Sequence, residues 1–142
     1  MYYIPRYFTL EELVPQDVFH ALGDRAWILL DGRILWTLDA LRETLDVPLV
    51  VNNWKAGGNF QQRGFRTVAI DARYSQHMCG RATDFDIQGN NAEAFRNQVR
   101  LGYFAKELRY ITRIEDGVNW IHIDCADIER RGNKAIHFFN GF

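Results

Sequence analysis

Hydrophobic residues recur at helical spacing in three stretches of this chain. Residues 26–44 carry apolar side chains three or four positions apart, which predicts a helix, although Asp31-Gly32 weakens its first half. Residues 91–101 show the same period, and Asn91 is placed to cap that helix. A short helix is predicted at residues 10–13, where Thr9 opens a capping-box pattern.

Elsewhere apolar and polar residues alternate, which is typical of strands. After Gly80, the side chains of Ala82 and Asp84 would share one face of a strand, and Thr83 and Phe85 the other. Further strands are predicted at residues 48–51, 108–115, 119–125 and 135–139. Residues 52–66 are polar and rich in glycine, and are predicted to form a loop on the site side of the sheet.

This order of elements predicts an α+β fold with a small, mostly antiparallel sheet flanked by helices. With 142 residues, of which 47% are hydrophobic, the chain is long enough for one real core. We therefore expect a single domain over residues 1–142.

The most specific chemistry lies around the strand that follows Gly80. His77 and Asp84 stand seven positions apart across this glycine, so a tight loop entering a strand would bring an imidazole and a carboxylate together. His122, in the predicted strand 119–125, adds a second imidazole. Each residue alone is more simply explained as a turn cap, an acceptor of backbone N–H groups or a core histidine. Together they predict catalytic zinc, which takes three protein ligands and keeps a fourth position open.

These residues resemble the zinc motif of the M15 peptidases, the D-Ala-D-Ala carboxypeptidase group to which many phage endolysins and the zinc fold of the hedgehog signalling domain are related. The resemblance covers residues 50–124 and includes Gly64-Phe65-Arg66, which is similar to a Gly-Tyr-Arg segment ahead of the motif in that family. The first motif matches at all five fixed positions, which are Ser75, His77, Gly80, Ala82 and Asp84, and Trp120-Ile121-His122 matches the second.

The resemblance implies a hedgehog-like or DD-peptidase-like fold, with Zn²⁺ held by His77, Asp84 and His122. It also implies cleavage of the cross-link peptides of peptidoglycan. An arginine, here Arg66, would polarise the scissile carbonyl or hold a substrate carboxylate. Arg63 competes with Arg66 for this role, and geometry must decide between them.

At the positions where many members of that family carry the catalytic base, this chain has other residues. Many members carry a Glu three residues before the last ligand or a His two before it, whereas this chain has Asn119 and Trp120 there. If Asp116 and Asn119 flank the turn of a hairpin, Glu115 would lie opposite Trp120 and Arg113 opposite His122, all on one face, with Asp116 on the other. We therefore predict Glu115 as the base, which takes a proton from water and returns it to the leaving amine. The alternative is an exposed hairpin carboxylate.

Two neighbours are predicted to support the ligands. Ser75 or Asp124 could accept the outer N–H of a ligand imidazole and so fix its tautomer. Trp120 is a candidate for a substrate platform, although aromatic residues more often fill cores. The other candidates for that platform are Trp54, Phe60, Phe65 and Tyr74.

A rival interpretation is a closed structural site in which Cys79 and Cys125 join the two histidines. It is disfavoured because His122 and Cys125 are an odd number of positions apart and point to opposite faces of a strand. The two cysteines are expected to be buried thiols rather than a disulfide.

Charge and hydropathy exclude two classes of partner. The net charge is −1 with scattered basic residues, which argues against nucleic-acid binding, and no apolar run is long enough to span a membrane. The first residues lack the features of a signal peptide, so we expect synthesis in the cytoplasm. By the resemblance, a wall-cutting enzyme would then be a phage lysin freed by a holin or a virion component with other virion proteins as partners.

Two functions follow from these observations. The first is a zinc peptidase that hydrolyses peptidoglycan peptides by D,D- or L,D-cleavage. The second is a non-catalytic zinc-binding virion or binding protein that keeps the peptidase fold. This alternative stays open because Asn119 and Trp120 stand where many members of the family carry the catalytic base.

Overall fold

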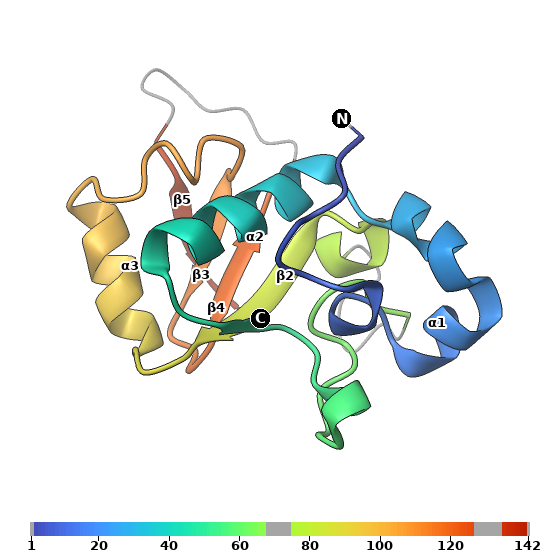
Figure 1. The fold of residues 1–142 in the computed structure, drawn as a ribbon. Helices are drawn as coiled ribbons and strands as arrows, with labels where there is room; N and C mark the ends of the chain where they lie inside the picture. Colours follow the sequence, from blue (N-terminus) through green and yellow to red (C-terminus); the bar gives the residue numbers. More distant parts are fainter. Residues whose placement is uncertain (1, 68–74, 127–134, 142) are drawn as a thin grey trace.

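A five-stranded sheet with helices packed on it forms the body of the protein (Figure 1). The computed structural model describes residues 2–67, 75–126 and 135–141. The helices are α1 (Gln16–Leu22), α2 (Gly32–Leu45) and α3 (Ala92–Arg100), with short 3₁₀ segments η1 (Leu10–Glu12), η2 (Gly23–Leu29), η3 (Trp54–Ala56) and η4 (Gln76–Cys79). The strands are β1 (Leu49–Val50), β2 (Ala82–Ile87), β3 (Arg113–Asp116), β4 (Ile121–Asp124) and β5 (His137–Asn140).

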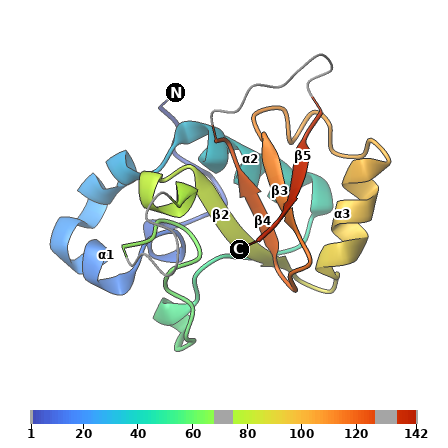
Figure 2. The same ribbon diagram turned by 180° about the vertical axis from the view of Figure 1, so that it is seen from behind.

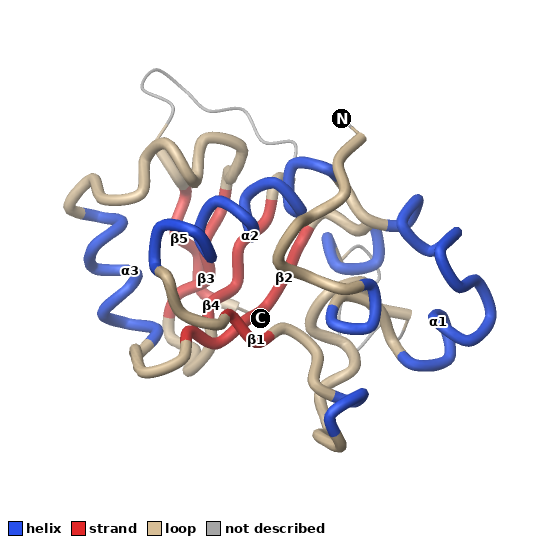
Figure 3. The backbone as a smooth tube through the Cα atoms, in the orientation of Figure 1, coloured by secondary structure: helices blue, strands red, loops and turns tan. Residues whose placement is uncertain are grey.

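The strand order is β1-β2-β4-β3-β5 (Figure 3). All neighbouring pairs are antiparallel except β3 and β5, which run parallel. The predicted α+β class with a mostly antiparallel sheet is confirmed. No helix among the described residues is long and apolar enough to cross a membrane.

The two faces of the sheet have different surroundings. Helix α2 lies across one face, whereas the view from behind shows β4, β3 and β5 with no helix in front of them (Figure 2). Strand alternation sends most of the apolar side chains to the α2 side and most of the polar ones to the other face. The core on the α2 side includes Ile34, Leu35, Leu38 and Leu41 of α2 with Phe85, Ile114, Ile121 and Ile123 of the sheet.

The predicted helix at residues 26–44 was too long at its start. Helix α2 begins at Gly32, because the Asp31 side chain accepts a hydrogen bond from the backbone N–H of Arg33 at 2.8 Å and so caps the helix. The residues before it form η2 instead. The Asn91 cap of α3 is confirmed, since its side chain accepts from the Ala94 N–H at 2.8 Å.

The register predicted for the β3–β4 hairpin is wrong by two residues. Arg113 pairs with Asp124 and Ile114 with Ile123, so Glu115 is not opposite Trp120 and Arg113 is not opposite His122. The loop at residues 117–120 has four residues rather than the two expected between Asp116 and Asn119, and the buried Arg96 guanidinium binds it by donating to the carbonyls of Val118 and Trp120 at 2.8 and 3.0 Å. A shift of two residues preserves the face of every side chain.

The strand predicted at residues 108–115 is also shorter than expected. Turns continue from α3 to Tyr110, and β3 begins only at Arg113. Strand β5 is displaced from the predicted residues 135–139 to His137–Asn140.

Candidate metal centre

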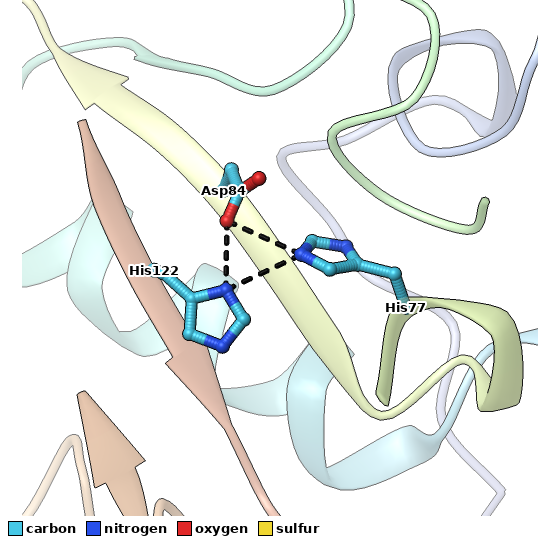
Figure 4. A group of neighbouring side chains, drawn as sticks. All are labelled: His77, Asp84 and His122. Atoms are coloured by element: carbon cyan, nitrogen blue, oxygen red, sulfur yellow. Dashed lines mark hydrogen bonds and ion pairs between the residues drawn. The ribbon is translucent and has the colours of Figure 1, made fainter. Parts of the chain in front are cut away.

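Three side chains from separate elements meet on the sheet face opposite α2 (Figure 4). Asp84 of β2 lies directly across from His122 of β4, and η4 brings in His77. The distances are 2.8 Å from His122 Nδ1 to Asp84 Oδ1, 3.3 Å from His77 Nε2 to Asp84 Oδ1 and 3.2 Å between the two imidazole nitrogens. The structure therefore brings together all three predicted ligands.

This spacing fits a zinc ion. Ligands at about 2.0 Å from a tetrahedral metal lie about 3.3 Å from one another, which is close to the three observed distances. Among the described residues no further His, Cys, Asp or Glu completes the group. One tetrahedral position would thus be left for water or substrate.

The rival site with two cysteines does not form. Cys79 is exposed, Cys125 is buried, and neither joins the His-Asp-His group. Burial raises the pKa of the Cys125 thiol to about 12, which disfavours the thiolate that zinc requires.

Each histidine ligand is held from outside by an oxygen that faces its second ring nitrogen. His77 Nδ1 lies 2.9 Å from the Gly64 carbonyl and His122 Nε2 lies 2.9 Å from Asp124 Oδ2. Because these oxygens only accept, the two outer nitrogens are the donors, and in the neutral imidazoles that a metal requires the inner nitrogens present lone pairs. Three acceptor atoms then converge on one point, an arrangement that a cation stabilises.

The pKa values of His122 and Asp84 in the metal-free site also indicate that the site favours a positive charge. Burial alone would lower the pKa of His122, but hydrogen bonds with Asp124 and Asp84 outweigh it and raise this pKa to about 9. Burial would raise the pKa of Asp84, but hydrogen bonds from His122 and His77 hold it well below its usual range. A metal ion would replace the proton that His122 otherwise carries.

Asp124 is fully buried and connects the centre to β3. Its carboxylate accepts from Arg113 Nη2 at 2.8 Å and from the Ala126 backbone N–H at 3.1 Å, besides facing His122. This is the outer contact predicted for Asp124. Ser75 behaves differently: its Oγ accepts the backbone N–H of His77 at 3.2 Å and caps η4, while the Gly64 carbonyl faces the ring.

Two glycines shape the loops that carry these contacts. Gly80 has φ +69°, and a Cβ there would collide with the carbonyl of Leu29. A Cβ on Gly64 would collide with the carbonyl of Leu13, which also accepts the Phe65 N–H at 2.8 Å. Close packing on the N-terminal segment therefore places both His77 and the carbonyl that orients it.

Geometry separates the two candidate arginines. Arg66 Nη2 lies 3.3 Å from Asp84 Oδ2, at the edge of the metal group. Arg63 instead pairs with Asp86 at 2.9 Å and stacks on the Phe60 ring with its guanidinium carbon 4.3 Å from the centroid. Arg66 is thus the arginine placed beside the ligands.

Where the structure describes the aromatic residues predicted for a substrate platform, their rings do not contact one another. Trp120 and Phe60 are exposed, Trp54 donates its indole N–H to the Val14 carbonyl at 3.0 Å, and Phe65 packs against the N-terminal segments. Tyr74 lies outside the described residues. Trp120 stands in the loop before β4, with its carbonyl bound by Arg96.

Glu115 and Asp116 point to opposite faces of β3. The Arg96 and Arg100 side chains of α3 pair with Asp116, on the helix side of the sheet. Glu115 is half-buried on the metal side, where the charges of His122, Asp84, His77 and Arg66 all act on it. Burial is the main reason that its pKa is raised above the ordinary value.

Sequence reasoning missed the contribution of β5. Phe139 sets its ring edge-on against the His122 imidazole, with 5.7 Å between centroids, and the Arg113 guanidinium carbon lies 4.5 Å above the same Phe139 ring. Only the parallel pairing of β5 with β3 brings this residue to the centre. The alternation of residues 135–139 predicted a strand but no neighbour for it.

The site defines a class of protein. A buried His-Asp-His group with outer hydrogen bonds to each ligand, and a carboxylate on the same sheet face, is the arrangement of a metal-dependent hydrolase.

Comparison with known families makes the assignment more specific. The chain belongs to the peptidase M15 family, whose model matches residues 6–124. The family and the His-Asp-His group together support a zinc peptidase. Neither the curated proteins nor the solved structures contain a match to this chain.

Proposed function

We propose that this protein is a zinc-dependent peptidase that hydrolyses peptide bonds in peptidoglycan, by D,D- or L,D-cleavage. The observation that carries the proposal is the triangle of His77, Asp84 and His122 ligand atoms, 2.8 to 3.3 Å apart, with Glu115 on the same face. Membership of the M15 family supports the peptidase chemistry. The assignment of peptidoglycan as the substrate is inferred from the resemblance of the sequence motifs to those of the M15 peptidases.

The residues of the chain divide the work between them. Zinc, when held by the His-Asp-His group, supplies Lewis acidity toward water and the scissile carbonyl. Glu115 takes the proton of the attacking water and passes it to the leaving amine. Arg66, beside Asp84, offers positive charge to the oxyanion that develops on the carbonyl. Asp124 holds the His122 ring in the tautomer that the metal needs.

The raised pKa of Glu115 agrees with this role. A base works best when its pKa lies near the working pH, and burial moves this carboxyl in that direction. Asp116 is already engaged by two arginines on the other face, so it is not a competing base.

The proposal is tested with purified cell walls from several bacterial groups. We expect the zinc-loaded protein to release new amino groups from peptidoglycan, and chelation to stop the release until zinc is restored. Full zinc occupancy without any release from these walls would contradict a wall peptidase. We further propose that the protein acts as a phage lysin or as a virion component, which lysis assays and virion proteomics distinguish.

The second candidate is a zinc-binding protein without turnover. It is favoured by Asn119 and Trp120, which occupy the positions where many relatives carry the base. Arg66→Ala separates the two functions. In an enzyme it should lower kcat by about a hundredfold with a smaller change in KM, because the arginine acts mainly on the transition state. In a binding protein it would alter affinity for wall fragments alone. Arg63→Ala, which removes the Asp86 pair, is the matched control.

A further inference from the structure

Strand β5 lies beyond the residues that the family model matches, yet it borders the metal centre. Its parallel pairing sets Glu115 beside Phe139 and Asp116 beside Asn140. Phe139 faces His122 and Arg113, whereas the adjacent Phe138 lies under the Arg100 guanidinium of α3, 4.2 Å from the ring centroid. One strand thus contributes alternate side chains to the site face and to the helix face.

Gly141 follows directly after β5 and touches Glu115. A Cβ built on Gly141 would overlap Oε1 of the Glu115 carboxylate and crowd its Cδ at 3.2 Å. The third nearest atom is the Cγ of the same side chain, at 3.9 Å, when the two residues adjoining Gly141 in the chain are left aside. The carboxylate therefore occupies the space that any larger residue would fill.

The backbone does not itself require glycine at this position. Gly141 is not among the glycines of the described residues that have positive φ, unlike Gly80 or Gly117. Its φ therefore lies outside the left-handed region that favours glycine. The three atoms nearest to a Cβ at this position all belong to the Glu115 side chain.

We infer that Gly141 is a positioning residue, whose bare Cα seats the Glu115 carboxylate beside the metal centre. The inference rests on the proposed function in one respect, the role of Glu115 as the base. A Cβ at residue 141 would displace a carboxylate at the end of a flexible side chain, so the chain would still fold. The carboxylate would lose its place toward the His-Asp-His group. Misplacing a catalytic group by about 1 Å can cost about a hundredfold in rate.

Gly141→Ala tests the inference, with Asn140→Ala as the matched control. Asn140 is exposed and pairs with Asp116, on the face away from Glu115. We expect Gly141→Ala to lower kcat between tenfold and a hundredfold, with KM, zinc content and melting temperature close to wild type. Asn140→Ala should leave kcat unchanged. A Gly141→Ala enzyme with wild-type kcat would overturn the inference.

A second comparison shows whether the effect passes through Glu115. In a Glu115→Gln background, adding Gly141→Ala should lower activity no further, because the base is already absent. A purely structural role would still add its own loss, and that result would contradict the inference.

An independent readout keeps this test apart from the test of function. The ¹³C resonance of the Glu115 carboxyl, in zinc-loaded protein, should move in Gly141→Ala and stay in place in Asn140→Ala. If wild type were inactive on all substrates, the proposed function would fail while this shift still decided the contact. If the resonance did not move in Gly141→Ala, Gly141 would not position the Glu115 carboxylate.

Discussion

The β2–β4 half of the site and the β3–β5 half are built in different ways. In the first half, Asp84 and His122 are a direct cross-strand pair, and both histidines and the carboxylate have outer partners. In the second half, Glu115 is half-buried and is positioned through adjoining residues. Arg100 of α3 binds Asp116, the next residue on β3, and the Glu115 carboxylate fills the space that a Cβ at Gly141 would occupy. A metal site tolerates little freedom, whereas a base needs access to water and to the leaving group.

The comparison predicts that damage to the first half removes the metal and damage to the second removes only the chemistry. His122→Ala should show the largest effect. We expect loss of most of the zinc, which wild type should bind at about one per chain, loss of detectable hydrolysis, and a lower melting temperature in zinc, since binding to the folded state stabilises it. Metal analysis and thermal unfolding measure these changes.

His20→Ala is the control for this variant, because His20 is exposed on α1, away from the metal group. It should keep full zinc. A His122→Ala protein that also keeps full zinc would show that the ligand is misassigned.

Glu115→Gln should have the next largest effect and confine it to the rate. We expect hydrolysis to fall by about a hundredfold or more, since a positioned base contributes at least that much, while zinc content and fold persist. Asp116→Asn, one residue away on the other face, should keep most activity and lose some stability as its pairs with Arg96 and Arg100 weaken. Steady-state kinetics on wall fragments would reverse the choice of base if only Asp116→Asn lost activity.

The same division explains how far the sequence alone could be interpreted. The ligands of the first half lie in a short motif, where Gly80 tightens the loop and strand alternation fixes the face of Asp84. The face of Glu115 was predicted correctly from a wrong register, because an error of two residues leaves the face unchanged. The start of α2 was missed because the local Asp31 cap prevailed over the hydrophobic period.

What escaped prediction depends on contacts between distant segments. The outer partner of His77 is a backbone carbonyl, at Gly64, and backbone carbonyls carry no sequence signal. Phe139 and Gly141 reach the site only through parallel pairing of β5 with β3. Pairing partners of a strand are not encoded in its own alternation, which sets only its two faces.

Asp124→Asn tests a residue that links the two halves of the site. Asp124 belongs to β4, but Arg113 of β3 binds its carboxylate. Loss of the negative charge should weaken zinc affinity by about tenfold to a hundredfold, the usual effect of changing a group that orients a ligand. Competition with a chelator measures the affinity.

Asp86→Asn is the control for that variant, since Asp86 lies on the same strand face as Asp84 but pairs with Arg63. It should retain wild-type affinity for zinc. Equal affinities in Asp124→Asn and wild type would remove Asp124 from the centre.

Ser75→Ala should have the smallest effect and test what holds His77. Ser75 caps η4 through the backbone N–H of His77, whereas the Gly64 carbonyl faces the ring. Loss of a helix cap costs about 1 kcal/mol of stability. We therefore expect a slightly lower melting temperature in metal-free protein and a zinc affinity within about twofold of wild type. If Ser75 instead fixed the His77 tautomer, the affinity would fall as far as in Asp124→Asn, because both side chains would then perform the same task.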